Sequence, residues 1–291
     1  MIHRDKDKFS KLVDRAASLT GFYAPLMEKD YYLTLFLSKI NELSDNLIFK
    51  GGTCLNKIYY SYYRLSEDLD FSMRLPDYST TRGNRRKCIQ PVKDNIENFA
   101  KQFDLRIEGV ENAGRNVLKQ YVYYLVYDSV LLPSKQTIKF EVGLRYNTIL
   151  KPELKDVQHK FLNPFSDEPL FDGGKVNSLS LNEIVSEKLR AAALRKIIAP
   201  RDFYDLDFII RQGFNLSDKE VLKLFVKKIE EDNGDPDLAK YKSNLGRSDK
   251  EIKDMKSRVE NELFDVLTVS ERDNFDLDTA LKRINKAMRI I

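Results

Sequence analysis

The chain has 291 residues, 42% hydrophobic and 32% charged, with a formal net charge of +4. This composition indicates an ordinary globular protein of one or two domains, and the slight basic excess suits a polyanionic partner. Its two cysteines, Cys54 and Cys88, and two histidines exclude a disulfide framework, and they exclude the usual four-ligand Cys/His zinc site unless carboxylates complete it.

The chain begins with the charged residues MIHRDKDKF, and no run approaches the roughly 18 apolar residues that span a bilayer. We therefore expect a cytoplasmic protein that makes no membrane contact.

The first quarter of the chain reads as helices followed by two short strands around a glycine pair. Apolar residues at helical spacing predict helices over 7–19 and 24–43, and NLIFK (46–50) reads as a buried strand. Gly51 and Gly52 interrupt that strand, Thr53 is a candidate N-cap, and 54–63 continues as a helix. The segment 66–73, SEDLDFSM, then has strand character.

The middle of the chain alternates in the way half-buried strands do. Residues 76–88 read as a basic loop, and a helical pattern follows from about Val92 to Phe103. The segments LRIEGV, LKQYVYYLVYDSV and QTIKFEVGLR predict strands, which suggests a mixed sheet of four or five strands flanked by helices.

After the Pro/Gly-rich stretch 163–175 the pattern is helical to the end of the chain. We therefore predict an α+β protein: an α/β domain over 1–175 and a mainly helical domain over 176–291.

Two carboxylates mark the strand that follows the glycine pair. Side chains alternate in an extended segment, so Asp68 and Asp70 share one face while Leu69 and Phe71 face the core. Two acidic groups facing one cleft are expensive unless a divalent cation lies between them, and Mg²⁺, or Mn²⁺, suits oxygen ligands. The alternative is an ordinary surface D-x-D pair without metal.

The glycine pair and a second acidic strand extend this site. Glycine lets backbone N–H groups approach an anion, and the following helix N-terminus adds a favourable dipole, so Gly51 and Gly52 suit a triphosphate beside the metal. Glu141 lies on the polar face of the later strand, and it becomes a third candidate metal ligand if that strand neighbours the one with Asp68.

A later helical segment carries cations. Lys188 and Arg195 are seven positions apart and therefore on one helix face, with Ala191 and Ala192 leaving room between them for an NTP tail. The alternative is a helix with small residues for packing and solvated charges.

Two motifs in this order resemble the AbiEii/AbiGii family of nucleotidyltransferase toxins, distant relatives of the DNA polymerase β-like nucleotidyltransferases. The first is F-K-G-G-T followed by R-x-S-E-D-L-D-F, within 49–71, and the second is E-K-L followed by R-D-x-Y-D-L, within 187–206. The resemblance covers about residues 24–212. It implies a nucleotidyltransferase-like sheet and Mg²⁺-assisted transfer of a nucleoside monophosphate from an NTP to an acceptor, with release of pyrophosphate.

The resemblance also implies residue roles. Asp68 resembles the principal metal-binding aspartate and Asp70 its partner. The turn of Gly52 and Thr53, with Ser66, resembles the phosphate contacts. Lys188 resembles the essential lysine and Asp205 the acidic residue of the last motif, so the helical domain would contribute Lys188 and Asp205 to the cleft.

Other readings of the second motif stay open. In one reading Asp202 is a functional residue, and in the other it begins a helix and satisfies free N–H groups. Asp205 is either functional or paired with Lys188 or Arg201 in a salt bridge.

The family implies the toxin of a bacterial toxin–antitoxin or phage-abortive-infection pair, with a cognate antitoxin that need not form a stable complex. Some members modify the 3′ end of tRNA, and an RNA acceptor predicts a basic surface near the cleft. The basic segment supplies one: Arg82, Arg85, Arg86 and Lys87. Such a cluster also occurs for solubility alone.

Two other functions remain open. The acceptor would be a small hydroxylated molecule, as in antibiotic-modifying nucleotidyltransferases, or the protein would bind a nucleotide or a partner with little catalysis. The neighbouring tyrosines Tyr59, Tyr60, Tyr62 and Tyr63 fit base stacking, although their helical spacing is more typical of a core.

Overall fold

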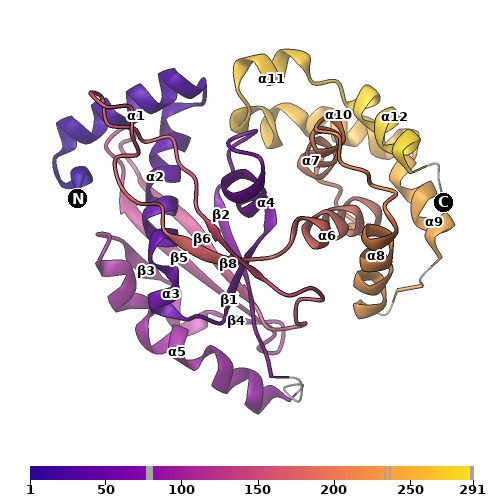
Figure 1. Cartoon of the computed structure of the whole chain (residues 1–291), viewed down its shortest axis with the longest axis horizontal. Coiled ribbons are helices and arrows are strands. Elements are labelled where there is room, and N and C mark those ends of the chain that lie inside the picture. Colours follow the sequence, from indigo (N-terminus) through magenta and orange to yellow (C-terminus); the bar gives the residue numbers. More distant parts are fainter. Residues whose placement is uncertain (77–80, 233, 236, 289–291) are drawn as a thin grey trace. The chain divides into compact units, whose positions relative to one another are not determined.

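A computed structural model describes residues 1–76, 81–232, 234–235 and 237–288. The chain divides into two compact units, Met1–Leu179 and Ser180–Ile291 (Figure 1). In the described part of the chain, no helix has both the length and the apolar character needed to cross a membrane.

The first unit is built on one mixed sheet. Its strand order is β3-β5-β6-β2-β1-β8-β7, with β4 pairing with β5. The pairs β2·β6 and β1·β8 are parallel and the other neighbours are antiparallel. The strands are β1 (Leu47–Lys50), β2 (Asp68–Met73), β3 (Arg106–Glu108), β4 (Gly114–Arg115), β5 (Gln120–Asp128), β6 (Lys135–Gly143), β7 (Glu153–Asp156) and β8 (Lys175–Ser178).

The α+β class and the mixed sheet predicted from the sequence are confirmed, but the expected four or five strands are too few. The additional strands β4, β7 and β8 have two to four residues each. Most side chains of β7 are exposed, so the strand carries no apolar alternation that a sequence pattern would reveal.

Five α-helices of the first unit are α1 (Lys6–Thr20), α2 (Ala24–Ser38), α3 (Ile40–Leu43), α4 (Gly51–Cys54) and α5 (Arg82–Lys101), and a π-helix η2 (Leu55–Tyr59) continues α4. Short 3₁₀ turns lie at η1 (Ile2–Arg4) and η3 (Val110–Asn112). The single helix predicted over 24–43 is wrong, because Lys39 leaves the helical conformation and separates α2 from α3.

The predicted basic loop over 76–88 is also wrong for its described second half. Helix α5 begins at Arg82, where the side chain of Thr81 accepts a hydrogen bond from the backbone N–H of Asn84. The helix then continues through Pro91, a residue that sequence reasoning treats as a boundary. Residues 77–80 lie outside the described part of the chain.

The apolar face of the sheet packs against α2 and α5. Phe71 of β2 lies 5.6 Å from Phe140 of β6 between ring centroids, and Phe140 lies 5.3 Å from Phe36 of α2. Phe36 in turn contacts Phe99 of α5 at 4.9 Å. Since neighbouring side chains of a strand point to opposite faces, the acidic residues of β2 project from the other face of this sheet.

The second unit is helical, as the sequence predicts. It contains α6 (Leu181–Leu194), α7 (Pro200–Arg211), α8 (Lys219–Glu231), α9 (Leu238–Gly246), α10 (Asp249–Glu262), the 3₁₀ turn η4 (Phe264–Val266), α11 (Val269–Asn274) and α12 (Leu277–Ala287). Ser, Thr or Asp side chains accept backbone hydrogen bonds at the start of most of these helices, which satisfies N–H groups that would otherwise lack partners.

Candidate active site

The carboxylates of β2 lie between two neighbouring strands. The burial of β2 alternates, with Asp68 and Asp70 half-buried and Leu69 and Phe71 buried, as expected for a strand with one polar face. Asp70 pairs with Lys50 of β1 on one side and with Glu141 of β6 on the other. The strand that carries Glu141 is therefore the direct neighbour of β2, which was the condition for a third ligand.

The charges around Asp70 oppose its ionisation. The pKa of Asp70 is raised to about 6, mainly by burial and then by the nearby carboxylates of Glu141 and Asp68, which together outweigh the lowering effect of Lys50 and Lys139. A cation bound among these carboxylates would favour the ionised form of Asp70, because it would offset their mutual repulsion.

Glu141 already has a cationic partner on its own strand. The Lys139 ammonium lies 2.5 Å from a carboxylate oxygen of Glu141, and both side chains occupy the same face of β6 because they are two residues apart. A metal that used Glu141 would replace this ion pair.

The donor set fits a hard divalent cation held by two carboxylates. Among residues 1–76, 81–232, 234–235 and 237–288, no group of three or more Asp, Glu, His or Cys side chains is arranged to hold a metal. Mg²⁺, however, is commonly bound through one or two carboxylates, with substrate phosphates and water completing its shell. Asp68 and Asp70 fit that role, and Glu141 stands beside Asp70 in register.

The glycine turn lies against the same carboxylate. Gly51 has a φ of +79°, and a Cβ at this position would lie 2.7 Å from an oxygen of Asp70. A Cβ on Gly52 would lie 2.6 Å from the Arg64 guanidinium and 3.2 Å from the Ser66 hydroxyl. Gly51 is favoured both by its positive φ and by the close approach of Asp70, whereas a side chain at Gly52 would displace the Arg64 guanidinium.

Thr53 does not cap the helix as predicted, because α4 already begins at Gly51 and the N-cap position is Lys50. The Thr53 hydroxyl instead donates to the backbone carbonyl of Asp68, which ties the glycine turn directly to the carboxylate strand. A hydroxyl has one donor hydrogen, so Thr53 in this state offers a phosphate its backbone N–H rather than its hydroxyl.

Arg64 belongs to the first motif, but sequence reasoning assigned it no role. Its side chain is 2% exposed, its guanidinium donates to the Leu65 carbonyl at 2.8 Å, and it lies over the Tyr63 ring. Because it also borders Gly52, it brings a permanent positive charge to the glycine turn. The arginine of the R-x-S-E-D-L-D-F motif was the feature of the sequence that could have identified Arg64 as a site residue.

The neighbouring tyrosines mainly build the scaffold. Tyr62 and Tyr63 are buried, and the Tyr59 hydroxyl donates to the Leu179 carbonyl at 2.7 Å. These contacts favour the core interpretation over base stacking.

A lysine cluster forms in the second unit between α6 and α7. The Lys188 ammonium lies 2.9 Å from Asp202 and 2.8 Å from Asp205, and the Arg195 guanidinium contacts the second oxygen of Asp202 at 2.8 Å. Both aspartates are buried, whereas the Lys188 side chain retains 14% exposure. Two buried carboxylates thus hold one lysine whose side chain is partly exposed.

The expected geometry of this cluster needs two corrections. Helix α6 ends at Leu194, so Arg195 lies beyond the helix and reaches the cluster through Asp202 rather than by sharing a helix face with Lys188. Ala192 is buried and packs in the interior of the unit, whereas Ala191 is half-buried, so only Ala191 has exposed surface near the cations.

Asp202 lies in the first turn of α7, but its carboxylate oxygens bind Lys188 and Arg195 and no side-chain cap is formed at the start of this helix. Of the two partners left open for Asp205, the structure shows Lys188.

The basic cluster on α5 lies on the other side of the sheet. Arg82, Arg86 and Lys87 are exposed and Arg85 is half-buried, all within the first turns of α5. That helix packs on the apolar face through Phe99 and Phe36, whereas the carboxylates project from the opposite face. The structure therefore does not bring this cluster together with Asp68 and Asp70.

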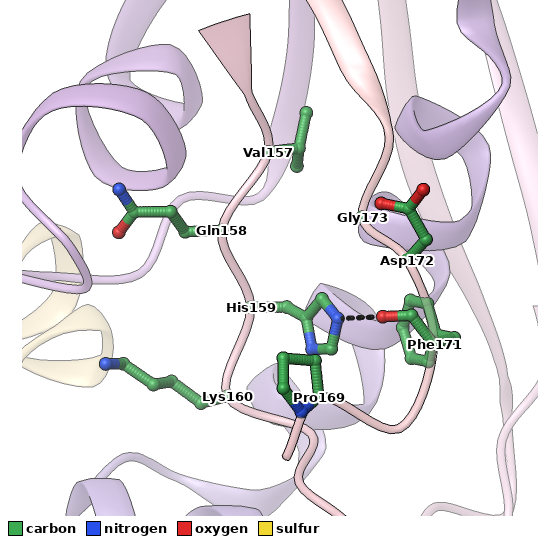
Figure 2. Close-up of a pocket in the computed structure, with 8 residues that line it drawn as sticks. All are labelled: Val157, Gln158, His159, Lys160, Pro169, Phe171, Asp172 and Gly173. Atoms are coloured by element: carbon green, nitrogen blue, oxygen red, sulfur yellow. Dashed lines mark hydrogen bonds between the residues drawn. The ribbon is translucent and has the colours of Figure 1, made fainter.

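A pocket of about 570 Å³ in the first unit is lined by residues 157–160, 169 and 171–173 (Figure 2). The His159 ring stacks on Phe171 with centroids 4.2 Å apart, and its two nitrogens bond to the Phe171 carbonyl and the Phe161 N–H. Gln158 and Lys160 point to the other side of their segment from His159 (Figure 2). No residue predicted from the sequence lines this pocket.

Comparison with protein families adds independent information. Residues 35–287 match the family described as the nucleotidyl transferase AbiEii toxin of Type IV toxin–antitoxin systems. No curated protein matches the chain significantly.

Several solved structures share the fold. MenT4, a nucleotidyltransferase toxin from Mycobacterium tuberculosis, aligns with a TM-score of 0.60 at 16% identity over 97% of this chain and 98% of that chain. JHP933 from Helicobacter pylori aligns with a TM-score of 0.53 at 16% identity over 92% of both chains. At this identity the similarity shows a common fold, which extends over nearly the whole length of each chain.

Proposed function

The chain belongs to the AbiEii family of nucleotidyltransferase toxins, and from this premise we propose that it transfers a nucleoside monophosphate from an NTP to the 3′ end of tRNA. The reaction would release pyrophosphate and act in the cytoplasm, where both substrates occur. The observation that carries the proposal is the pairing of Asp70 with Glu141 beside the glycine turn, which gathers acidic and phosphate-binding groups at one place.

In this proposal Asp68 and Asp70 hold Mg²⁺, with Glu141 as a further candidate ligand. Bound Mg²⁺ would neutralise charge on the phosphate oxygens and align the attacking and leaving groups. The chain contributes the spacing of the two carboxylates on one strand and the neighbouring cations Lys50 and Lys139, which limit the repulsion before substrate arrives.

The triphosphate is assigned to the glycine turn. The backbone N–H groups of Gly51, Gly52 and Thr53 lie in the first turn of α4 and would donate to an anion, and the Ser66 hydroxyl and Arg64 guanidinium border Gly52. These donors bind and orient the phosphates while the sheet keeps the reacting groups in line.

Lys188 and Arg195 of the second unit are proposed to bind nucleotide phosphates, with Asp205 orienting the lysine. A lysine held by two carboxylates is a mobile point charge that phosphate oxygens attract strongly. The two aspartates would set its position before the nucleotide binds.

The proposed acceptor is tRNA, and the proposed partner is a cognate antitoxin that need not form a stable complex. The basic residues of α5 would contact the RNA backbone away from the reacting end, since they lie on the opposite side of the sheet from the carboxylates. This separation also favours one alternative, in which the acceptor is a small hydroxylated molecule and α5 plays no part.

Incubation of the protein with Mg²⁺, each labelled NTP and total tRNA tests the proposal. Wild type should label tRNA, and Asp68→Asn should abolish labelling because the amide is a weaker, uncharged metal ligand. Asp156→Asn is the matched control, since Asp156 is an exposed strand residue of the same unit. Circular dichroism verifies that both variants fold.

The outcomes separate the alternatives. Loss of labelling in Asp68→Asn, with Asp156→Asn active, supports nucleotidyl transfer and identifies the base that is used. Labelling of a small hydroxylated acceptor without tRNA would overturn the RNA acceptor, and NTP binding without any labelling would favour the binding protein. Replacing Arg85 and Arg86 with Glu should weaken tRNA labelling at low salt while NTP binding stays unchanged.

A further inference from the structure

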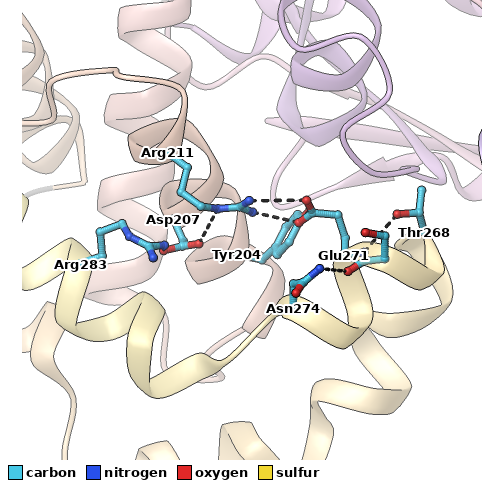
Figure 3. Close-up of polar contacts among 8 residues, drawn as sticks. Tyr204, Asp207, Arg211, Thr268, Glu271, Asn274 and Arg283 are labelled. Atoms are coloured by element: carbon cyan, nitrogen blue, oxygen red, sulfur yellow. Dashed lines mark hydrogen bonds and ion pairs between the residues drawn. The ribbon is translucent and has the colours of Figure 1, made fainter.

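Helix α7 is anchored on two sides by polar contacts. One side carries Asp202 and Asp205, which hold Lys188 of α6. The other side carries Tyr204 and Arg211, which bind the carboxylate of Glu271 in α11 (Figure 3). The same helix therefore connects the lysine cluster with the C-terminal helices.

The contacts of Glu271 are direct. The Tyr204 hydroxyl donates to a carboxylate oxygen of Glu271 at 3.0 Å, and the Arg211 guanidinium reaches the same oxygen at 2.9 Å. Arg211 also binds Asp207 at 3.1 Å, and Arg283 of α12 binds the second oxygen of Asp207 (Figure 3). Both final helices of the chain thus hold α7 through charged hydrogen bonds.

Tyr204 is enclosed at this junction. Its side chain is 0% exposed, and its ring contacts Phe275 edge-on at 5.3 Å and lies beside Phe208. Burial and the Glu271 carboxylate raise the pKa of the Tyr204 hydroxyl, so it remains a hydrogen-bond donor at neutral pH.

Glu271 is itself held in place. It lies in the first turn of α11, where the side chain of Thr268 accepts a hydrogen bond from the Glu271 N–H at 3.3 Å. The capping hydrogen bond therefore helps to fix the backbone from which the Glu271 carboxylate reaches Tyr204 and Arg211.

The position of Tyr204 in the helix couples it to the aspartates. Tyr204 and Asp205 are consecutive residues, so any rotation of α7 that moves the tyrosine away from Glu271 also moves the Asp205 carboxylate away from Lys188. Asp202 lies about one turn earlier on the same rigid helix and would move with it.

We propose that Tyr204, Glu271 and Arg211 form a positioning clasp that fixes the rotation of α7 and, through Asp202 and Asp205, the orientation of Lys188. Only the expected change in the KM for NTP rests on the proposed function. The accessibility of Lys188 can be measured without any substrate. It gives α11 a part in positioning Lys188 through the contacts of Glu271 with α7.

The test uses Tyr204→Phe, which removes one hydrogen bond and keeps the ring. Tyr241→Phe is the matched control, because Tyr241 is a buried tyrosine of α9 in the same unit that packs on Phe225. The first readout is the rate at which acetic anhydride modifies Lys188, measured by mass spectrometry on the full chain. Tyr204→Phe should raise this rate several-fold, with an exposed lysine such as Lys250 unchanged.

The second readout is the kinetics of NTP-dependent labelling. Tyr204→Phe should raise the KM for NTP about tenfold with a smaller change in kcat, since charged hydrogen bonds of this kind are individually strong. Glu271→Gln should have a similar effect, and the double variant should be no worse than the more severe single one, because both changes remove the same contact.

The outcomes distinguish the clasp from the activity. Increased Lys188 modification in a protein that transfers no nucleotide would support the clasp and overturn the proposed function. Unchanged Lys188 modification and unchanged KM in a folded Tyr204→Phe protein would overturn the clasp. A loss of thermal stability equal to that of Tyr241→Phe, with neither readout altered, would likewise show that the contact only stabilises the fold.

Discussion

Each unit contains a helical lysine paired with aspartate, and the two lysines differ in their access to water. The Lys57 side chain is 0% exposed and contacts Asp30 at 2.8 Å, the Thr34 hydroxyl at 2.8 Å and the Tyr62 hydroxyl at 3.1 Å. The Lys188 side chain is 14% exposed and is shared between Asp202 and Asp205.

This difference assigns the two lysines different roles. Lys57 is enclosed by partners that all belong to the interior, and desolvation lowers its pKa, so no substrate anion reaches it. Lys188 is bound by two carboxylates and keeps contact with solvent, so a phosphate can compete for it. The exposure of Lys188 and its two carboxylate partners support the role proposed for it, whereas full burial makes Lys57 part of the core.

Lys188→Ala provides the strongest test of the contrast. It should lower kcat/KM for nucleotide transfer about a thousandfold, or about 4 kcal/mol of transition-state stabilisation, because a charge on the triphosphate is lost. Stability should fall as well, because the substitution removes the Lys188 ion pair from the buried Asp205 carboxylate, so the loss of activity is compared at equal amounts of folded protein. The measurement is steady-state labelling beside differential scanning calorimetry, and a variant with full activity would end the catalytic assignment.

Lys57→Met should lower the stability of the protein and leave nucleotide transfer by the folded fraction intact. Removal of one partner of a buried pair leaves Asp30 uncompensated and should reduce the free energy of unfolding by about 3 kcal/mol or more. Any remaining folded protein should retain nucleotide transfer. Urea unfolding measures the loss, and a stable but inactive Lys57→Met protein would contradict the comparison.

Replacing the whole buried group sharpens the contrast. The triple variant Lys57→Met, Asp30→Leu, Tyr62→Phe should regain about 1–2 kcal/mol relative to Lys57→Met, because no buried charge remains without a partner. Neutralising Lys188 together with Asp202 should restore no activity. If the triple variant is less stable than Lys57→Met, packing rather than charge dominates the Lys57 site.

The smallest expected effect is a loss of folding stability at alkaline pH. The pKa values of Tyr62 and Tyr204 are raised above the unfolded value of about 10, first by burial and then by neighbouring carboxylates. Each tyrosine therefore contributes stability that is complete below pH 10 and is lost above it, by about 1.4 kcal/mol at pH 11. Tyr62→Phe and Tyr204→Phe should each flatten this decline, and an unchanged slope between pH 10 and 11 would contradict the assignment.

The local features of the carboxylate strand were predictable because they depend on short-range geometry. Alternation along a strand is a property of the backbone, so Asp68 and Asp70 had to share a face once the segment was extended. The N-terminal limit of α5 and the break at Lys39 were not predictable, because Pro91 inside a helix and a single non-helical residue depend on the packing around them.

The sequence by itself determined the α+β class, the helical second half and the two motifs, since periodicity and residue type express local backbone and solvent preferences. Only the tertiary structure decided that Glu141 stands in register with Asp70, that Arg195 reaches Asp202 from beyond α6, and that α5 lies across the sheet from the carboxylates. These relations join residues distant in the chain, and they depend on which strands pair and which face each helix covers.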